Sequence, residues 1–183
     1  MTLSSQPPFS RPSSADPYLA ALAQRVLIFD GATGTNLQTQ DLSADDFGGS
    51  AFEGCNELLV LTRPDAVERL HRSFLDVGVD VIETDSFGSF SVVLGEYGIA
   101  ERAFELSHAA ATLARRVADE YTSAAQPRFV AGSIGPGTKF PTLGQITYDE
   151  LSASYEEMAL GLLEGGVDLL LVETMFDLLS GKA

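Results

Sequence analysis

The chain has 183 residues, of which 45% are hydrophobic and 20% are charged, and its formal net charge is −15. This composition is typical of one globular domain that can bury a sizeable core. The excess of acidic over basic residues argues against nucleic acid and anionic membranes as partners, because both require a basic surface.

The N-terminal segment predicts a disordered tail over residues 1–17, because it is rich in Ser and Pro and lacks the layout of a signal peptide. The chain has a single cysteine, Cys55, so it forms no internal disulfide, and we expect a reducing, cytoplasmic setting. No apolar stretch is long enough to predict a membrane span.

Hydrophobic periodicity and turn residues predict alternating helices and strands along the remainder. Pro64 predicts the start of a helix with Thr62 as a nearby cap, and Thr147 with Glu150 has the spacing of a capping box. A long turn-rich loop is expected from Gly31 to Gly54. We expect helices at 18–24, 64–77, 90–97, 100–121, 147–165 and from 176 onward, and strands at 25–29, 79–84, 128–133 and 167–174.

A short phrase occurs twice: residues 78–84 read GVDVIET, and residues 166–174 read GVDLLLVET. Each copy is an apolar strand that follows an amphipathic helix and ends in a carboxylate and a threonine. Apolar strands alternating with helices predict an α/β fold with a parallel sheet, either an open sheet or the first half of a (β/α)8 TIM-type barrel. We favour residues 18–183 as the N-terminal half of such a barrel, incomplete at its C-terminus. Its open edges would favour pairing with a second half or with another copy.

Carboxylates stand at the ends of the expected strands: Asp30 after the first, Glu83 and Asp85 after the second, and Glu173 after the fourth. In a parallel barrel these ends share one rim, where the acids could hold an ammonium group, a metal or a proton in transit. The alternative is that each acid faces solvent or caps a helix.

Glycine-rich turns at 31–34 and 135–137 could present backbone N–H groups to an anion, although neither matches a nucleotide-binding fingerprint. Lys139 beside the second turn is expected to be solvated. His71 and His108 fall inside helices, and Cys55 is expected to be buried. We therefore assign no catalytic residue and no metal ligand in this chain.

Taken together, several phrases resemble the homocysteine-binding module at the N-terminus of cobalamin-dependent methionine synthases, over about residues 25–183. The phrases occur in the same order as in that family: FDGATGT at 29–35, GCNELL at 54–59, TRP at 62–64, ETDSF at 83–87, GSIGP at 132–136 and VETMFD at 172–177. Betaine– and S-methylmethionine–homocysteine methyltransferases share the general pattern.

The resemblance implies a homocysteine S-methyltransferase whose barrel binds homocysteine through zinc and receives the methyl group from methylcobalamin. The family's three zinc cysteines lie in the second half of the barrel and have no match here, and the cobalamin and folate modules lie outside the chain. The resemblance carries over an amino-acid clamp. Asp30 and Glu173 would hold the substrate ammonium, the backbone of Gly31 and Ala32 would receive its carboxylate, and Thr84 and Asp85 would line the same rim.

Other functions stay open at this point. One is a non-catalytic half barrel that associates with a second half or with itself. Another is a fragment of a betaine- or S-methylmethionine-type homocysteine methyltransferase. A third is a different barrel enzyme, such as a lyase or aldolase, although no lysine stands at a strand end to form a Schiff base.

Overall fold

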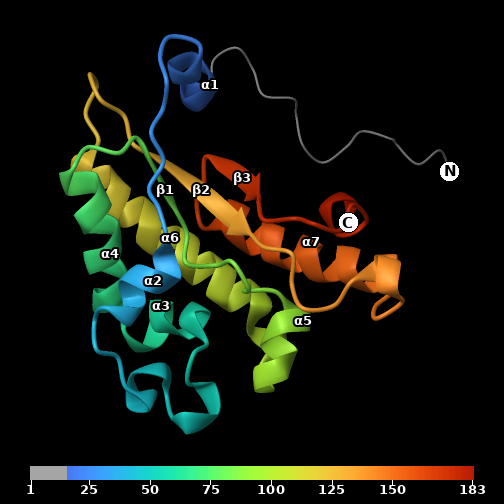
Figure 1. Ribbon diagram of the computed structural model, residues 1–183. Coiled ribbons are helices and arrows are strands. Elements are labelled where there is room, and N and C mark those ends of the chain that lie inside the picture. Colours follow the sequence, from blue (N-terminus) through green and yellow to red (C-terminus); the bar gives the residue numbers. More distant parts are fainter. Residues whose placement is uncertain (1–15) are drawn as a thin grey trace, which may run out of the picture.

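The computed structural model describes residues 16–183, and the predicted tail therefore lies almost wholly outside the described residues. Three parallel strands form a sheet in the order β1-β2-β3, and helices pack along it (Figure 1). The elements in chain order are α1 (Pro17–Leu22), α2 (Thr33–Gln38), α3 (Leu59–Thr62), α4 (Pro64–Asp76), β1 (Val81–Glu83), α5 (Ser91–Leu94), α6 (Ala103–Tyr121), β2 (Phe129–Ile134), α7 (Tyr148–Glu164) and β3 (Leu169–Val172), with short 3-10 turns between them.

The predicted helices are found with small changes at their ends. Pro64 occupies the first turn of α4, and the Thr147–Glu150 capping box begins α7. The prediction that Thr62 caps α4 is wrong: Arg63 holds the cap position, and the Thr62 hydroxyl donates to the Leu58 carbonyl at 3.0 Å. Thr62 instead ends the short helix α3, which the sequence did not predict.

The predicted strand at 25–29 is only partly formed. Its one ladder contact is the parallel bridge of Phe29 with Val81, and Val26 and Ile28 are exposed. The Asp30 N–H donates to the Val81 carbonyl at 3.0 Å, so the segment does lie alongside β1.

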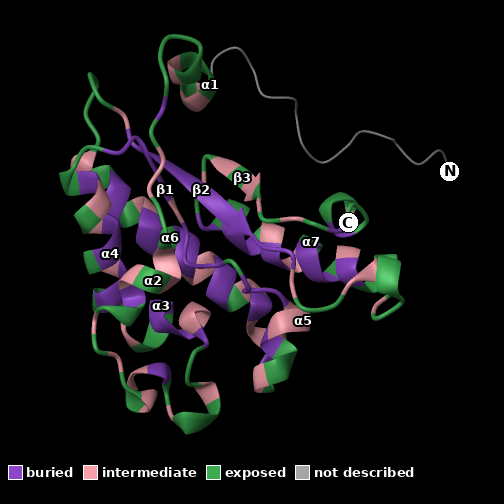
Figure 2. Cartoon of the chain, in the orientation of Figure 1, coloured by how far each residue is buried: buried purple, intermediate pink, exposed green. Residues whose placement is uncertain are grey.

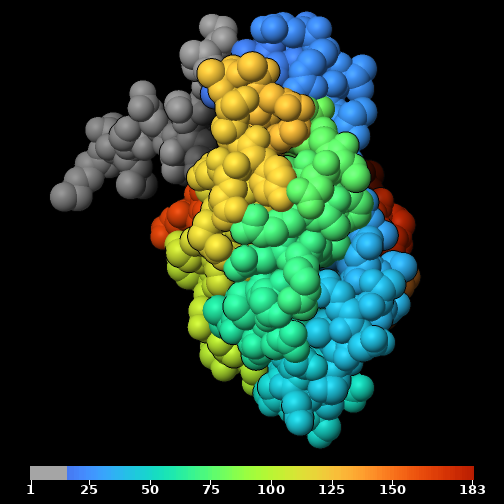
Figure 3. All heavy atoms as spheres, turned by 90° about the vertical axis from the view of Figure 1, so that its left-hand side faces the viewer, coloured from blue at the N-terminus to red at the C-terminus, as the bar shows by residue number. Residues whose placement is uncertain are grey.

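Two other expectations also change. The predicted loop after Gly31 contains the helix α2 and two 3-10 turns, and α2 lies against α4, as the space-filling view shows (Figure 3). The helix predicted from Phe176 is wrong: this region holds only a 3-10 turn at Ser180–Lys182. Asp177 accepts the N–H groups of Leu179 and Ser180 and closes that turn instead.

Strands β1 and β2 are covered on both faces, as is usual in a parallel sheet, whereas β3 is partly exposed. Ile82 and Val130 join a large cluster with α4 and α6, while Val81 and Phe129 join a second cluster on the opposite face, under α1. Figure 2 shows β1 and β2 as buried, whereas β3 alternates between intermediate and exposed residues.

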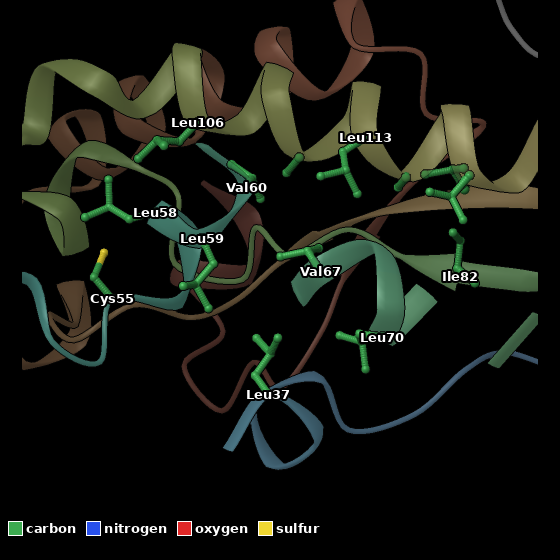
Figure 4. Close-up of a cluster of buried hydrophobic side chains, with 14 of the residues drawn as sticks. Leu37, Cys55, Leu58, Leu59, Val60, Val67, Leu70, Ile82, Leu106 and Leu113 are labelled. Atoms are coloured by element: carbon green, nitrogen blue, oxygen red, sulfur yellow. The ribbon is translucent and has the colours of Figure 1, made fainter. Parts of the chain in front are cut away.

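The larger cluster fills the space between the sheet and helices α3, α4 and α6 (Figure 4). Cys55 points into it among leucines and is 1% exposed, so the prediction of a buried cysteine is confirmed. In the part of the chain that the structure describes, no helix combines the length and apolarity needed to cross a bilayer.

The first copy of the repeated phrase begins with a clamp between neighbouring backbones. Gly78 has a φ of 95°, which favours glycine, and it turns the chain from α4 into β1. The carboxylate of Asp80 accepts the Ile28 N–H at 2.9 Å and binds the Arg25 guanidinium through two hydrogen bonds of 2.8 and 2.7 Å. The Arg25 bonds hold the pKa of Asp80 below its ordinary value.

The second copy repeats this arrangement at β3. Gly166 has the same φ of 95°, and the Asp168 carboxylate accepts the Val130 N–H at 2.7 Å and the Arg115 guanidinium at 2.8 Å. The Asp168 N–H in turn donates to the Val130 carbonyl at 2.9 Å. The repeat is therefore a structural device that fixes where each strand begins beside its neighbour.

We expect Asp80→Ala to destabilise the fold by about 3 kcal/mol, because Asp80 is buried and its loss leaves a guanidinium and an N–H without their partner. Asp168→Ala should cost about 1–2 kcal/mol, since that carboxylate is more exposed. Urea unfolding followed by circular dichroism measures both free energies. Asp45→Ala is the control, because Asp45 is exposed. Equal stability of all three variants would contradict a stabilising role of the Asp80 and Asp168 carboxylates.

Candidate functional site

A cavity of roughly 450 Å³ opens at the carboxyl ends of β1, β2 and β3. It has the size of a pocket for a small metabolite. Its wall is formed by residues from the turn before α2, the 3-10 turn before α3 and the strand ends: Gly31, Ala32, Thr33, Gly34, Asn56, Glu57, Glu83, Thr84, Asp85, Phe87, Ser133 and Glu173.

Strand alternation brings three polar side chains to the same face. Along β3, Leu169 and Leu171 pack in the cluster under α1, and Glu173 follows at the next position of that period. Glu83 follows Val81, and Ser133 follows Ala131, in the same way. One face of the sheet is thus apolar under α1 at the start of the strands and polar at their carboxyl ends, where the cavity lies.

Glu173 is held from the neighbouring strand. The Ser133 hydroxyl donates to its carboxylate, and the Glu173 N–H donates to the Ile134 carbonyl at 3.1 Å. Thr174 directly after it has a φ of 58°, a left-handed conformation that a β-branched residue rarely adopts. Such strain persists where the surrounding structure determines the backbone, and it is frequent at functional sites.

Glu83 lies on the cavity wall beside Glu173. Burial raises the pKa of Glu83 to about 7, and the negative charge of Glu173 adds to this rise. The sequence prediction included Glu83 among the strand-end acids but left it out of the substrate clamp.

Asp30 is placed differently from the other predicted clamp residues. Its two carboxylate oxygens accept the Glu83 N–H at 3.1 and 3.0 Å, and Asp30 is not among the residues that line the cavity. Burial raises the pKa of Asp30 to about 7, and the charges of Glu83 and Glu173 add to this rise. Asp30 therefore ties the first chain segment to the end of β1 close to the other acids.

Thr84 and Asp85 both line the cavity, but the Thr84 hydroxyl is hydrogen-bonded whereas one Asp85 oxygen is not. The Thr84 hydroxyl pairs with the Ser86 hydroxyl at 2.6 Å and accepts the Ser133 N–H at 3.0 Å, so it joins β1 to β2. Asp85 is 5% exposed, and its Oδ2 has no hydrogen-bond partner. Burial, and then the charge of Glu57, raise the pKa of Asp85 well above its ordinary value.

Glu57 is a wall residue to which sequence reasoning assigned no role. Its Oε1 accepts the Gly88 N–H at 2.8 Å and so joins the turn before α3 to the loop after β1. A Cβ at position 88 would lie 2.7 Å from this oxygen, so any larger residue there would displace the Glu57 carboxylate from its hydrogen bond. The GCNELL phrase contained Glu57, but only the fold shows that it faces Asp85.

Gly31 and Ala32 line the cavity as predicted. Their N–H groups donate to no acceptor within residues 16–183, because α2 begins only at Thr33. They are available donors for an anionic group. The other glycine-rich turn, at 135–137, and Lys139 do not line this cavity.

The charge of the cavity has one sign. Its wall carries Glu57, Glu83, Asp85 and Glu173, with Asp30 adjacent, and none of the residues that line it is Lys, Arg or His. His71 is buried within α4, and His108 lies in α6, as predicted. An acidic pocket next to free N–H donors suits a ligand that carries both an ammonium group and a carboxylate.

The donor set does not suggest a metal centre. In the described residues no group of three or more His, Cys, Asp or Glu side chains has the arrangement needed to hold a metal ion. A second, more apolar cavity of about 370 Å³ lies between α7 and the segment after β3, and Glu156 is the only charged side chain on its wall.

Comparison with known proteins identifies the family. A family model described as homocysteine S-methyltransferase matches residues 27–183, so the chain belongs to that family. It is 52% identical over 165 residues to methionine synthase of Mycobacterium tuberculosis, and 51% identical to that of Mycobacterium leprae. Each match covers 90% of this chain and 14% of the relative, so the chain spans a small part of those proteins.

Solved structures show the same fold. The metallated form of the homocysteine methyltransferase MmuM from Escherichia coli matches with a TM-score of 0.72 and 21% identity, over 90% of this chain and 59% of that chain. Its oxidized form matches with a TM-score of 0.74 and 22% identity, over 90% and 58%. The likeness confirms an α/β fold with a parallel sheet.

We expect Glu83→Gln to stabilise the chain relative to wild type, and more so at pH 8 than at pH 5.5. The pKa of Glu83 is about 7 in the fold and 4.5 ordinarily, so the folded chain retains a proton that the unfolded chain releases. Wild-type stability therefore falls as pH rises through this window, by about 2 kcal/mol after allowance for solvent screening.

Urea unfolding of both proteins at the two pH values measures this difference. His71 titrates in part of the same range, but it is present in both proteins and cancels in the comparison. A wild-type-to-variant difference that does not change with pH would contradict the raised pKa.

Proposed function

Because the chain belongs to the homocysteine S-methyltransferase family, we propose that it supplies the amino-acid-binding part of a methionine synthase-type enzyme that methylates homocysteine sulfur. The observation that carries this proposal is the cavity at the strand ends, with acidic side chains on one side and free backbone N–H groups on the other. Homocysteine presents the complementary groups, an ammonium and a carboxylate, on one carbon.

In this proposal the ammonium group binds at Glu173, whose carboxylate is oriented by the Ser133 hydroxyl. Asp30 does not line the cavity, so it would act on the ammonium group by its charge and by fixing the backbone of Glu83. The substrate carboxylate would accept the N–H groups of Gly31 and Ala32. Burial strengthens such charge-assisted hydrogen bonds.

Thr84 and Asp85 would complete the pocket in different ways. The Thr84 hydroxyl is engaged with Ser86 and Ser133, so we assign it the role of holding the rim together. Asp85 has an unpaired oxygen and would accept a hydrogen bond from the bound amino acid.

The family resemblance implies zinc and cobalamin, but the described residues do not fit a zinc ion. Cys55 is the only cysteine; it is buried in the hydrophobic cluster and does not line the cavity, although its thiol donates to the carboxylate of the wall residue Glu57 at 3.7 Å. We therefore assign neither group to this chain. Methionine synthase is favoured over the betaine and S-methylmethionine types by the sequence identity to the mycobacterial enzymes.

We further propose that the sheet is the first part of a (β/α)8 barrel. Its strands are parallel and in chain order, and the chain matches just over half of the E. coli enzyme. The exposure of Leu170 and Val172 on β3 is consistent with further barrel elements packing there.

Titration calorimetry with L-homocysteine tests the binding role. We expect saturable binding to the wild type, and a decrease in affinity of roughly 10- to 100-fold for Glu173→Gln, which loses a charge-assisted hydrogen bond. Asp30→Asn should weaken binding less, since it acts at longer range.

Glu53→Gln is the matched control, because Glu53 is exposed and lies outside the cavity. Unchanged affinity in both Glu173→Gln and Asp30→Asn, with wild-type folding by circular dichroism, would rule out the clamp.

A further inference from the structure

We propose that Glu83 is a third carboxylate of the ammonium site, and that the empty site carries a proton which the incoming ammonium group displaces. The inference rests on the proposed function and extends it. It assigns a ligand-contacting role to Glu83, and it couples substrate binding to proton release.

The position of Glu83 is fixed by contacts on its backbone. Its N–H donates to both oxygens of Asp30, and strand alternation directs its side chain to the face that carries Glu173. Glu83 and Glu173 line the same cavity, so their carboxyl groups share one acidic pocket. An ionised carboxylate can only accept hydrogen bonds, so two such groups in one pocket favour a proton on one of them.

Nothing on the cavity wall neutralises the remaining charge. The segment before α2 contributes Asp30, the turn before α3 contributes Glu57, the loop after β1 contributes Asp85, and β3 leads into Glu173. The strand β2 contributes the neutral Ser133, and the wall includes no basic residue. Like charges gathered in one pocket disfavour ionisation of all the carboxyl groups at once, so the site without ligand retains protons.

An independent observation points to a ligand with N–H donors. The Oδ2 of Asp85 is buried on the cavity wall and has no partner in the described chain. A buried polar atom without a partner is unfavourable, and an ammonium group can donate three hydrogen bonds. Glu83, Glu173 and Asp85 provide acceptors from three segments around one cavity.

The exchange balances in charge and in protons. The ammonium group enters with one positive charge, and one proton leaves Glu83 for the buffer. No bond of the amino acid is formed or broken. Burial and the charge of Glu173 raise the pKa of Glu83 to about 7, so the exchange would take place near neutral pH.

The test is calorimetry of L-homocysteine binding to the whole chain at pH 7 in two buffers with different enthalpies of protonation. We expect wild type to release on the order of half a proton per molecule bound, because a group with its pKa at the working pH is half protonated. Glu83→Gln should release at least two-fold less and bind at least 10-fold more weakly. Glu53→Gln, which removes the same charge from the surface, should match wild type.

The desamino analogue of homocysteine, which keeps the thiol and the carboxylate, should release no proton. Homocysteine binding without proton release, or the same release from Glu83→Gln, would overturn this inference and leave the proposed function standing. Absence of any homocysteine binding would overturn both.

The resting proton has its own test in the absence of ligand. Infrared spectra of wild type and Glu83→Gln between pH 6 and 8 should differ by one titrating protonated carboxyl band. Asp30 and Asp85 are present in both proteins, and burial is the largest cause of both of their raised pKa values, so most of their signal cancels in the difference. Identical protonated-carboxyl signals would overturn the proton assignment whatever the binding result.

Discussion

The rest of this structure depends on one interaction: an aspartate at the start of a strand accepts a hydrogen bond from the backbone N–H of the neighbouring segment. The Asp80 carboxylate accepts the Ile28 N–H and forms an ion pair with Arg25. The Asp168 carboxylate accepts the Val130 N–H and forms an ion pair with Arg115. Each of these hydrogen bonds sets the stagger between two parallel segments at one end of the sheet. The stagger then determines which side chains meet at the opposite end.

Asp80 and Glu83 lie at opposite ends of β1 and differ in how their charge is stabilised. Arg25 neutralises Asp80, and this carboxylate contributes to stability in its ionised form. Glu83 shares the cavity wall with Glu173 and with no basic residue, and burial disfavours its ionised form. This contrast separates structural from functional carboxylates more clearly than residue type does.

The sequence predicted those parts of the fold that depend on local pattern. Helices α4, α6 and α7 follow from periodicity, and the capping box at Thr147 follows from spacing. The extended segment at 25–29 was predicted as a full strand because its composition is apolar, but only Phe29 pairs with β1, and Val26 and Ile28 stay exposed. The helix expected from Phe176 failed because Asp177 closes a tight turn on the following N–H groups. Such competition between a side chain and the helix backbone depends on the local geometry.

Of the candidate site, the residues at the strand ends could be predicted from the sequence, whereas contacts between distant segments could not. Glu173, Asp85, Thr84 and the turn at Gly31 line one cavity because strand ends converge in any parallel sheet. The role of Glu57 could not be predicted, since it depends on a contact with Gly88 across 31 residues of sequence. Asp30 was assigned to direct contact, yet its oxygens are occupied by the Glu83 backbone.

The unequal length of the two repeat copies restricts how the gene can change. The second copy is longer by two residues, so Leu169, Leu171 and Glu173 keep the same face as Val81 and Glu83. An insertion or deletion of a single residue within either strand would turn its terminal glutamate to the opposite face of the sheet, away from the cavity. Only changes by an even number of residues preserve the pocket. Among related sequences, length variation inside these strands should therefore occur in steps of two, while the loops between them are free to vary by any number.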